Sequence, residues 1–362
     1  MLYLLLEIII VSIITFFGIK YFIEIAPKWG LIDIPNNRSS HHKPMPRGAG
    51  IAFGSIFIIT YSIFNFGFVQ ENILTFLAIT LVFSIGIIDD FFNVESKTKF
   101  LVLVIASVMV YYDGFVIDNL GTYFGYTIPL GFLALPFTVF ALTGFTNALN
   151  LIDGKDGLAA SVSIAILLVH VYIGYHFDDM LILSTALILI TVLAVFLIFN
   201  WYPAKVFMGD SGSLFIGFII SILTVQSLEY INVTTVLILA GLPILDTMVV
   251  MMRRKQRKLS IFSADKNHIH HILYNMKMDV KFTVIFLTRI QVTFSLIAIQ
   301  IISGEEIFNI LIFINLFLIF FTIFDPRARA RARHNRALSD RLRERYKRLQ
   351  KEKSDKQITT KE

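Results

Sequence analysis

The sequence predicts an all-α fold, a polytopic bundle of membrane-spanning helices. The chain is 56% apolar and 16% charged, with a mean hydropathy of +0.72, whereas soluble domains are about 45–50% apolar. Apolar runs of about 20 residues, the length that crosses a bilayer as a helix, recur along most of the chain. Lys and Arg are concentrated in alternate loops between these runs, as they are in polytopic membrane proteins.

About eleven segments are predicted to span the membrane. They cover residues 1–23, 47–67, 72–88, 99–112, 128–148, 158–175, 180–199, 211–229, 233–252, 282–302 and 306–324. The first run has no small-residue cleavage site, so we expect it to remain as a span rather than to be removed as a signal peptide. Cysteine is absent, which excludes disulfides and thiolate metal sites.

The distribution of basic residues predicts the orientation of these spans. Loops near residues 68–71, 113–127, 176–179, 230–232 and 303–305 contain neither Lys nor Arg. The opposite loops carry Lys28, Arg38, Lys43, Arg47, Lys97, Lys155, Lys205 and the run from Arg253 to Lys258. Because basic loops face the cytoplasm, we expect an outer N-terminus and a cytoplasmic C-terminus in the inner (plasma) membrane.

The most unusual stretch lies between two apolar runs. Asn147 and Asn150 are three residues apart and share one helix face, and Asp153 and Asp156 follow, each before a glycine. Polar groups beside hydrocarbon are costly and usually functional, and their oxygens suit a hard cation such as Mg²⁺. A helix cap also explains Asp156, and a calcium loop would need a regular alternation of ligands that is missing. We expect these residues to hold a metal-bound nucleotide diphosphate.

Asp89 and Asp90 end a predicted span. The C-terminus of a helix carries partial negative charge, so two adjacent carboxylates there are unfavourable unless a cation lies close by. The alternative is a solvated helix end without a function.

Two further polar stretches fall on the same predicted side. Glycines on both sides of Asp210 would let backbone N–H groups approach a phosphate at a helix N-terminus, with Asp210 on the metal and Phe207 stacked on a base; a helix cap is the alternative. His268, His270 and His271 form a cluster that suggests zinc. Without cysteine, and beside a basic run, the histidines are better explained as donors to phosphate oxygens.

In this order and on this side of the membrane, the motifs resemble the polyprenyl-phosphate N-acetylhexosamine-1-phosphate transferases (glycosyltransferase family 4), over about residues 30–275. The bacterial branch that makes undecaprenyl-diphosphate-linked GlcNAc is the most similar. The resemblance implies transfer of a sugar phosphate from a UDP-N-acetylhexosamine to undecaprenyl phosphate, with Mg²⁺ required and UMP released. It places this reaction at the first membrane step of cell-envelope polysaccharide synthesis, in contact with membrane lipids and without nucleic acid, and it suggests a homodimer.

The resemblance also implies residue roles. Asn150 and Asp210 look like the metal ligands, and Asp89, Asp90 and Lys99 look like the catalytic residues. The expected substrate-binding residues are Asn147, Asp153, Asp156, Phe207, His268, His270 and His271. The transmembrane catalytic domain is then 1–325, and 326–362 is a basic cytoplasmic tail, whose net charge from Arg327 onward is +9, with 14 Lys and Arg against 5 Asp and Glu.

Several alternatives stay open at this stage. The segment from Pro35 to Gly48 is similar to the O-antigen branch, which uses other UDP-N-acetyl sugars, whereas the histidine motif is similar to the GlcNAc branch. Asn93 stands where some relatives have a third carboxylate, so a functional role at that position is in doubt.

A secondary transporter would place polar residues near the bilayer midplane, often in repeated halves, and a membrane scaffold would keep the motifs without turnover.

Overall fold

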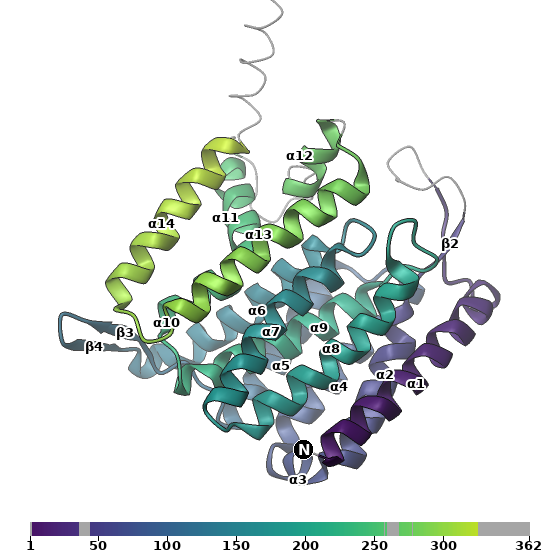
Figure 1. Cartoon of the computed structure of the whole chain (residues 1–362), viewed down its shortest axis with the longest axis horizontal. Coiled ribbons are helices and arrows are strands. Elements are labelled where there is room, and N and C mark those ends of the chain that lie inside the picture. The colour runs from purple at the N-terminus through teal and green to yellow at the C-terminus, as the bar shows by residue number, and fades with distance from the viewer. Residues whose placement is uncertain (1, 36–43, 257, 259–267, 277, 325–362) are drawn as a thin grey trace, which may run out of the picture. The chain divides into compact units, whose positions relative to one another are not determined.

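The structure is a computed structural model that describes residues 2–35, 44–256, 258, 268–276 and 278–324. Within these residues the fold is a bundle of helices with two short hairpins (Figure 1). The helices are α1 (Leu2–Ile25), α2 (Ala49–Phe64), α3 (Phe66–Glu71), α4 (Ile73–Phe92), α5 (Ser96–Tyr112), α6 (Ala134–Ile152), α7 (Leu158–His176), α8 (Met180–Asn200), α9 (Asp210–Gln226), α10 (Val233–Leu239), α11 (Gly241–Gln256), α12 (Ile269–Asn275), α13 (Val280–Gln300) and α14 (Glu306–Ile323).

Two compact units divide the chain, residues 1–314 and 315–362. The first unit contains the helical bundle and every residue predicted for the site. In the second unit, residues 315–323 continue α14. The predicted basic tail, 326–362, lies outside the described residues, as do positions 36–43 of the segment that is similar to the O-antigen branch.

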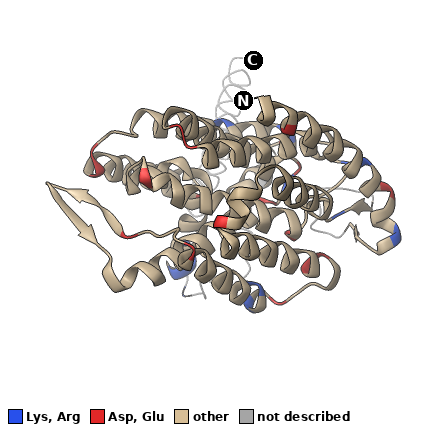
Figure 2. Cartoon of the chain, turned by 90° about the horizontal axis from the view of Figure 1, so that it is seen from below, with Lys and Arg blue, Asp and Glu red and all other residues tan. Residues whose placement is uncertain are grey.

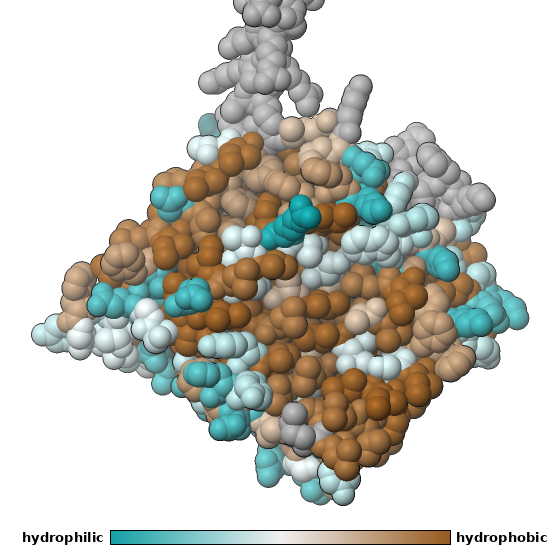
Figure 3. All heavy atoms as spheres, in the orientation of Figure 1, coloured by the Kyte–Doolittle hydropathy of each residue, from teal (hydrophilic) through white to brown (hydrophobic). Residues whose placement is uncertain are grey.

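The prediction of a multi-pass membrane protein is confirmed at the level of its helices. In the described ranges, eight helices are long and apolar enough to cross a membrane, and the bent pair α10–α11 raises this number to nine. Charged residues are sparse along the helices (Figure 2), and large apolar side chains form a broad exposed face (Figure 3). The predicted number of eleven also needs α2, of 16 residues, and α5, of 17 residues.

The segment 233–252, predicted as one span, consists of α10 and α11, which meet at an angle of 86°. Pro243 lacks an N–H group and cannot bond to the carbonyl of Leu239, four residues earlier. The buried side chain of Gln291, on α13, replaces the lost helical bonds. Its Nε2 donates to Leu239 O at 2.7 Å, and its Oε1 accepts from Leu242 N at 3.1 Å. A break inside a membrane is tolerated because these backbone groups find protein partners.

Two antiparallel hairpins were not predicted. The first pairs β1 (Ile32–Asp33) with β2 (Met45–Pro46), and the second pairs β3 (Asn119–Tyr123) with β4 (Tyr126–Pro129). Because β4 contains residues 128 and 129, the start predicted for the span 128–148 is wrong. The helix there, α6, begins at Ala134 and continues to Ile152, so that both Asn147 and Asn150 are helical. Gly125 allows the chain reversal, because its φ of +82° is accessible to glycine without strain.

Helix α9 is the most buried of the long helices, with 89% of its apolar stretch inside the protein. It packs against α2, α4 and α6, and glycines allow the backbones to approach closely. A Cβ on Gly50 of α2 would overlap the backbone nitrogen of Gly212, and a Cβ on Gly86 of α4 would lie 2.6 Å from Ser211 Cα. Gly54 similarly accommodates the ring of Phe83. Gly50 and Gly54, four residues apart on α2, therefore both serve close helix packing.

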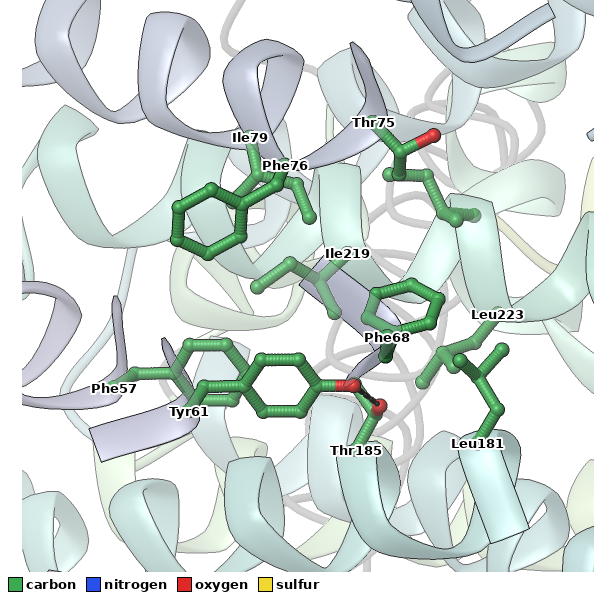
Figure 4. Close-up of a pocket in the computed structure, with 11 residues that line it drawn as sticks. Phe57, Tyr61, Phe68, Thr75, Phe76, Ile79, Leu181, Thr185, Ile219 and Leu223 are labelled. Carbon is green, nitrogen blue, oxygen red and sulfur yellow. Dashed lines mark hydrogen bonds between the residues drawn. The ribbon is translucent and has the colours of Figure 1, made fainter. Parts of the chain in front are cut away.

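The two ends of the bundle differ in chemistry. Figure 1 shows the N-terminus and α3 at one end, and β2 and α12 at the other. Near the first end, a small apolar pocket lies among α2, α3, α4, α8 and α9 (Figure 4). The hydroxyls of Tyr61 and Thr185 bond to each other at 2.7 Å across it. No charged side chain lines this pocket, so it has no group to hold a diphosphate.

We expect that Gly50→Ala lowers the free energy of unfolding by about 1–3 kcal/mol, because the added methyl group meets backbone rather than a movable side chain. Thermal unfolding of the purified protein in detergent, followed by tryptophan fluorescence, measures this change. Gly144→Ala in α6 is the matched control, since a Cβ there meets no atom within 4 Å. Equal melting temperatures for the two variants would contradict the packing argument.

Candidate functional site

Helix ends that are distant in sequence meet around the N-terminus of α9. The C-terminal turns of α4 and α6 contact the first turn of α9 through side chains, and the first turn of α5 does so as well. The chain places polar residues at these ends because helix termini leave backbone groups without helical partners. The convergence brings together residues 89, 90, 99, 150 and 210, which were predicted separately.

Asp90 is a cap for α9. One carboxylate oxygen accepts a hydrogen bond from Asp210 N at 2.9 Å, and the other accepts from Ser211 N at 3.2 Å and Ser211 Oγ at 2.5 Å. The side chain is buried, with 5% of its surface exposed. The negative charge also lies at the positive end of the α9 dipole. Both oxygens of Asp90 are therefore committed to holding α9 against α4.

Asp89, Lys99 and Asp210 form a second, more accessible group. The Lys99 ammonium lies 2.6 Å from Asp210 Oδ2 and 3.2 Å from Asp89 Oδ1. The exposed fractions of the three side chains are 19% for Lys99, 13% for Asp89 and 27% for Asp210. Asp89 also accepts a bond from Val94 N at 2.8 Å, which fixes its rotamer. Lys99 thus provides a positive charge between two carboxylates, as the analysis of Asp89 and Asp90 required.

Asn150 is joined to the first turn of α9 through one side chain. Ser213, one turn after Asp210 on α9, donates its hydroxyl to Asn150 Oδ1 at 2.8 Å. This bond orients the amide, and Asn150 remains half-buried. Asn147 lies one turn earlier on α6 and is exposed.

The loop from Asp153 to Asp156 follows directly after α6. Burial and the nearby carboxylates of Asp210, Asp90 and Asp156 raise the pKa of Asp153 to about 7. Asp156 accepts a bond from Ala204 N at 3.0 Å, so that one of its oxygens positions the loop after α8. The predicted nucleotide contact by Asp156 is therefore limited to its other oxygen.

The chain before α9 is tied to the start of α2. Phe207 donates its N–H to Pro46 O at 2.9 Å, and its carbonyl accepts from Ala49 N at 3.0 Å. The ring of Phe207 is half-buried at the edge of the site. Arg47 donates to the carbonyl of Asp90 at 2.9 Å, which places a positive charge at the C-terminal end of α4.

The three histidines lie on and before α12. His268 Nδ1 bonds to Asp246 Oδ2 at 2.9 Å, and the rings of His270 and His271 are 4.2 Å apart. His270 lies against Gly154, in the loop after α6, where a Cβ would overlap its Nε2. Burial lowers the pKa of His270 well below its usual value, and nearby His271, His268 and Lys155 add to this effect. His270 is therefore a neutral hydrogen-bonding group rather than a cation.

Comparison with known proteins decides the family. The sequence profile described as glycosyl transferase family 4 matches residues 72–228. A protein of Bacillus subtilis (strain 168), named as a probable undecaprenyl-phosphate N-acetylglucosaminyl 1-phosphate transferase, is 36% identical over 323 residues, covering 87% of this chain and 88% of the relative. The chain belongs to glycosyl transferase family 4.

More distant relatives carry a related name. The undecaprenyl-phosphate alpha-N-acetylglucosaminyl 1-phosphate transferase of Escherichia coli (strain K12) is 29% identical over 261 residues, covering 69% of this chain and 71% of the relative. The protein of Yersinia pestis with the same name is 30% identical over 260 residues, with the same two coverages. The family resemblance inferred from the order of the motifs is confirmed.

In this family 4 transferase, sequence reasoning missed several residues of the site. Asp246 is a buried carboxylate within a predicted span, and an intramembrane charge is a signal that would have found it. Ser211 and Ser213 are visible in the sequence only as possible helix caps. Their roles depend on where α4 and α6 end, which the sequence does not specify.

The donor set fits a magnesium ion. Mg²⁺ is usually bound by one or two carboxylates together with substrate phosphates and water, and Asp210 and Asn150 offer oxygen ligands at one helix end. The described residues contain no group of three or more His, Asp and Glu placed to hold a metal by themselves. Burial and, after it, the neighbouring carboxylates raise the pKa of Asp153, and a cation would offset the part that comes from these carboxylates.

Asp89 and Asp90 are expected to respond differently to the same substitution. Asp90→Asn replaces one acceptor oxygen with a donor, opposite buried N–H groups of α9, and should lower the free energy of unfolding by about 1–3 kcal/mol. Asp89→Asn keeps the acceptor for Val94 N and should change stability by less than about 1 kcal/mol. Thermal unfolding in detergent measures both. A larger loss in Asp89→Asn would refute the assignment of Asp90 as the cap.

Proposed function

We propose that this protein transfers N-acetylglucosamine 1-phosphate from UDP-GlcNAc to undecaprenyl phosphate and releases UMP, as the first membrane step of cell-envelope polysaccharide synthesis. The observation that carries the proposal is the group formed by Asp89, Lys99 and Asp210 at one end of a membrane bundle. The proposed substrates are inferred from the names of the relatives, which include undecaprenyl phosphate and N-acetylglucosaminyl 1-phosphate. A water-soluble nucleotide sugar and a lipid phosphate can both reach such a site.

The proposed orientation follows from the basic loops. Lys28, Arg47, Lys97, Lys155 and Lys205 belong to connections at the end of the bundle that holds the site, and positively charged loops face the cytoplasm. The active site then opens to the cytoplasmic face of the inner membrane, with the N-terminus outside. In this proposal α2 and α5 complete eleven spans, residues 1–325 form the catalytic domain and 326–362 are a cytoplasmic tail.

The reaction is a displacement at phosphorus. An oxygen of the lipid phosphate forms a bond to the phosphorus that bears the sugar, the phosphoanhydride bond breaks, and UMP leaves with the bridging oxygen. Catalysis of such a transfer depends mainly on alignment and on neutralising charge. The polar groups around the N-terminus of α9 are arranged for both tasks.

We assign the reactive role in the acidic pair to Asp89. Both oxygens of Asp90 accept hydrogen bonds from α9, whereas Asp89 is more exposed and faces Lys99. Asp89 is suited to orient the lipid phosphate and to hold its proton. Lys99 bridges Asp89 and Asp210, so phosphate oxygens of the substrates would compete with these carboxylates for its ammonium group.

Asp210 and Asn150 are the proposed ligands of Mg²⁺. When bound there, the ion would neutralise the diphosphate and the leaving group. Ser213 keeps Asn150 Oδ1 at the first turn of α9, and Asp90 keeps that turn in place. His270, held neutral, and its neighbours His268 and His271 are proposed to donate hydrogen bonds to the sugar diphosphate.

Purified protein incubated with UDP-GlcNAc, undecaprenyl phosphate and Mg²⁺ should release UMP and form the lipid diphosphate sugar, as measured by chromatography. Parallel reactions with UDP-GalNAc and other UDP-N-acetyl sugars test the O-antigen alternative suggested by the segment from Pro35 to Gly48. Faster turnover of another sugar would replace GlcNAc in the proposal. No release of UMP from any of them would refute the proposed enzyme activity.

Asp210→Asn and Asn150→Ala should each reduce Mg²⁺-dependent release of UMP by at least about 100-fold, since the first removes the negative charge of a ligand and the second removes an oxygen ligand. Asp118→Asn is the matched control, because Asp118 is an exposed carboxylate at the opposite end of the bundle. Near-wild-type activity of folded Asp210→Asn protein would rule out this metal assignment.

A further inference from the structure

Asp246 is a buried carboxylate in α11, with 2% of its surface exposed, and the reaction proposed above does not use it directly. A buried charge is costly unless hydrogen bonds satisfy it. Asp246 has two partners, both in the histidine segment. Its Oδ2 bonds to His268 Nδ1 at 2.9 Å, and its Oδ1 accepts from Ile269 N at 2.9 Å, at the first turn of α12.

We propose that Asp246 is a positioning residue for the histidine segment: it fixes His268 and the start of α12, and thereby holds His270 against the loop that follows Asn150. This inference rests on the proposed function, because it gives Asp246 a role in the same transfer. It adds a role for α11, whose Asp246 reaches the site through its hydrogen bonds to His268 and Ile269.

Asp246 determines which nitrogen of His268 carries the proton and how its ring is oriented. In this proposal the carboxylate of Asp246 accepts the hydrogen bond, so that the Nδ1 atom of His268 carries the proton. That bond fixes the tautomer and the plane of the ring, and it leaves Nε2 as the atom that faces a ligand. Partners of this kind behind a functional histidine are typically worth about 10–100-fold in activity or affinity.

His268 in turn restricts the orientation of the His270 ring. The rings of His268 and His270 are stacked, with centroids 6.0 Å apart and planes at 10°, so the orientation of one restricts the other. His270 is 3% exposed, and its Nε2 has no protein hydrogen-bond partner among the described residues. That atom lies directly on Gly154, between Asp153 and Lys155. Buried polar atoms usually have a hydrogen-bond partner, so His270 Nε2, beside the acidic loop, is available to bond to a ligand.

Two further observations place α12 on the same loop. The Lys155 ammonium lies 4.2 Å from the centre of the Tyr274 ring, a cation–π contact between the loop and α12. Asp246 and His270 also line one small pocket together with Ile152 and Leu158, which flank the loop. The bend at Pro243 directs α11 toward this position. Asp246, α12 and the loop therefore form one connected unit.

Kinetics of three variants test the proposal. Asp246→Asn retains an acceptor for Ile269 N but loses the carboxylate that fixes His268, so we expect kcat for UMP release to fall about tenfold or more. His268→Gln should cause a loss of similar size. The double variant should be no worse than the worse single variant, because both changes break one interaction. Losses that multiply instead would show that Asp246 and His268 act independently of each other and would overturn the proposal.

Cross-linking gives a readout that does not depend on turnover. The natural chain contains no cysteine, so Lys155→Cys with Tyr274→Cys provides one reactive pair across the loop and α12. A short bis-maleimide should join this pair in the otherwise unchanged protein, and Asp246→Ala or Asp246→Asn should reduce the yield at least about threefold. Unchanged yield in both variants would overturn the proposal.

Thr247→Val is the matched control in both experiments, because Thr247 is the next residue of α11 and its hydroxyl has no partner among the described residues. It should leave kcat and the cross-linking yield unchanged. If unmodified protein releases no UMP, the proposed function fails, while cross-linking still decides whether Asp246 positions α12. If Asp246→Ala unfolds, the milder Asp246→Asn variant carries the test.

Discussion

The arrangement of this protein depends on how the N-terminus of α9 is held inside the bundle. Asp90 accepts three hydrogen bonds from the first turn of α9, while Gly50 and Gly86 let α2 and α4 approach its backbone. A helix N-terminus has free N–H groups and partial positive charge. Burying it requires a negative partner, which Asp90 supplies from α4. Asp210 is thereby presented beside Asp89 and Lys99.

The charges gathered at this helix end agree with the proposal that the site binds a cation and phosphates. Asp89 and Asp210 share the ammonium of Lys99, and Asp153 feels the charges of Asp210, Asp90 and Asp156. Carboxylates placed this close repel one another at low dielectric. A divalent ion and phosphates would redistribute these interactions, because the ion neutralises carboxylates while Lys99 turns to phosphate. The same side chains that stabilise the free protein are therefore suited to hold the substrates.

The break between α10 and α11 gives the bundle a second route to the site. Gln291 satisfies the backbone groups that Pro243 leaves unpaired, so a span can change direction without exposing free polar groups. The redirected helix carries Asp246 to the start of α12 and the histidines to Gly154. A polar break of this kind resembles those of transporters. Here the break carries Asp246 to the histidine segment at the end of the bundle that holds the site.

The sequence by itself determined the class of fold and the family, and it singled out the polar residues that the structure brings together. Long apolar runs are expected to cross a membrane, and carboxylates beside them, such as Asp89, Asp90 and Asp210, are unfavourable unless they have partners. These conclusions need only local composition and order along the chain. For the same reason the two hairpins and the start of α6 were missed, because β3 and β4 are short and their pairing depends on a turn.

Only the tertiary structure decided how the residues divide their roles. Asp89 and Asp90 are equivalent in sequence, yet a helical rotation of about 100° between neighbours turns one toward α9 and the other toward Lys99. The bonds from Ser213 to Asn150 and from Asp156 to Ala204 join residues 63 and 48 positions apart. In the sequence Asp246 is an unexplained charge within an apolar segment, and only the bend at Pro243 brings it within hydrogen-bond distance of His268. Such contacts depend on the packing of several helices at once, which no local pattern encodes.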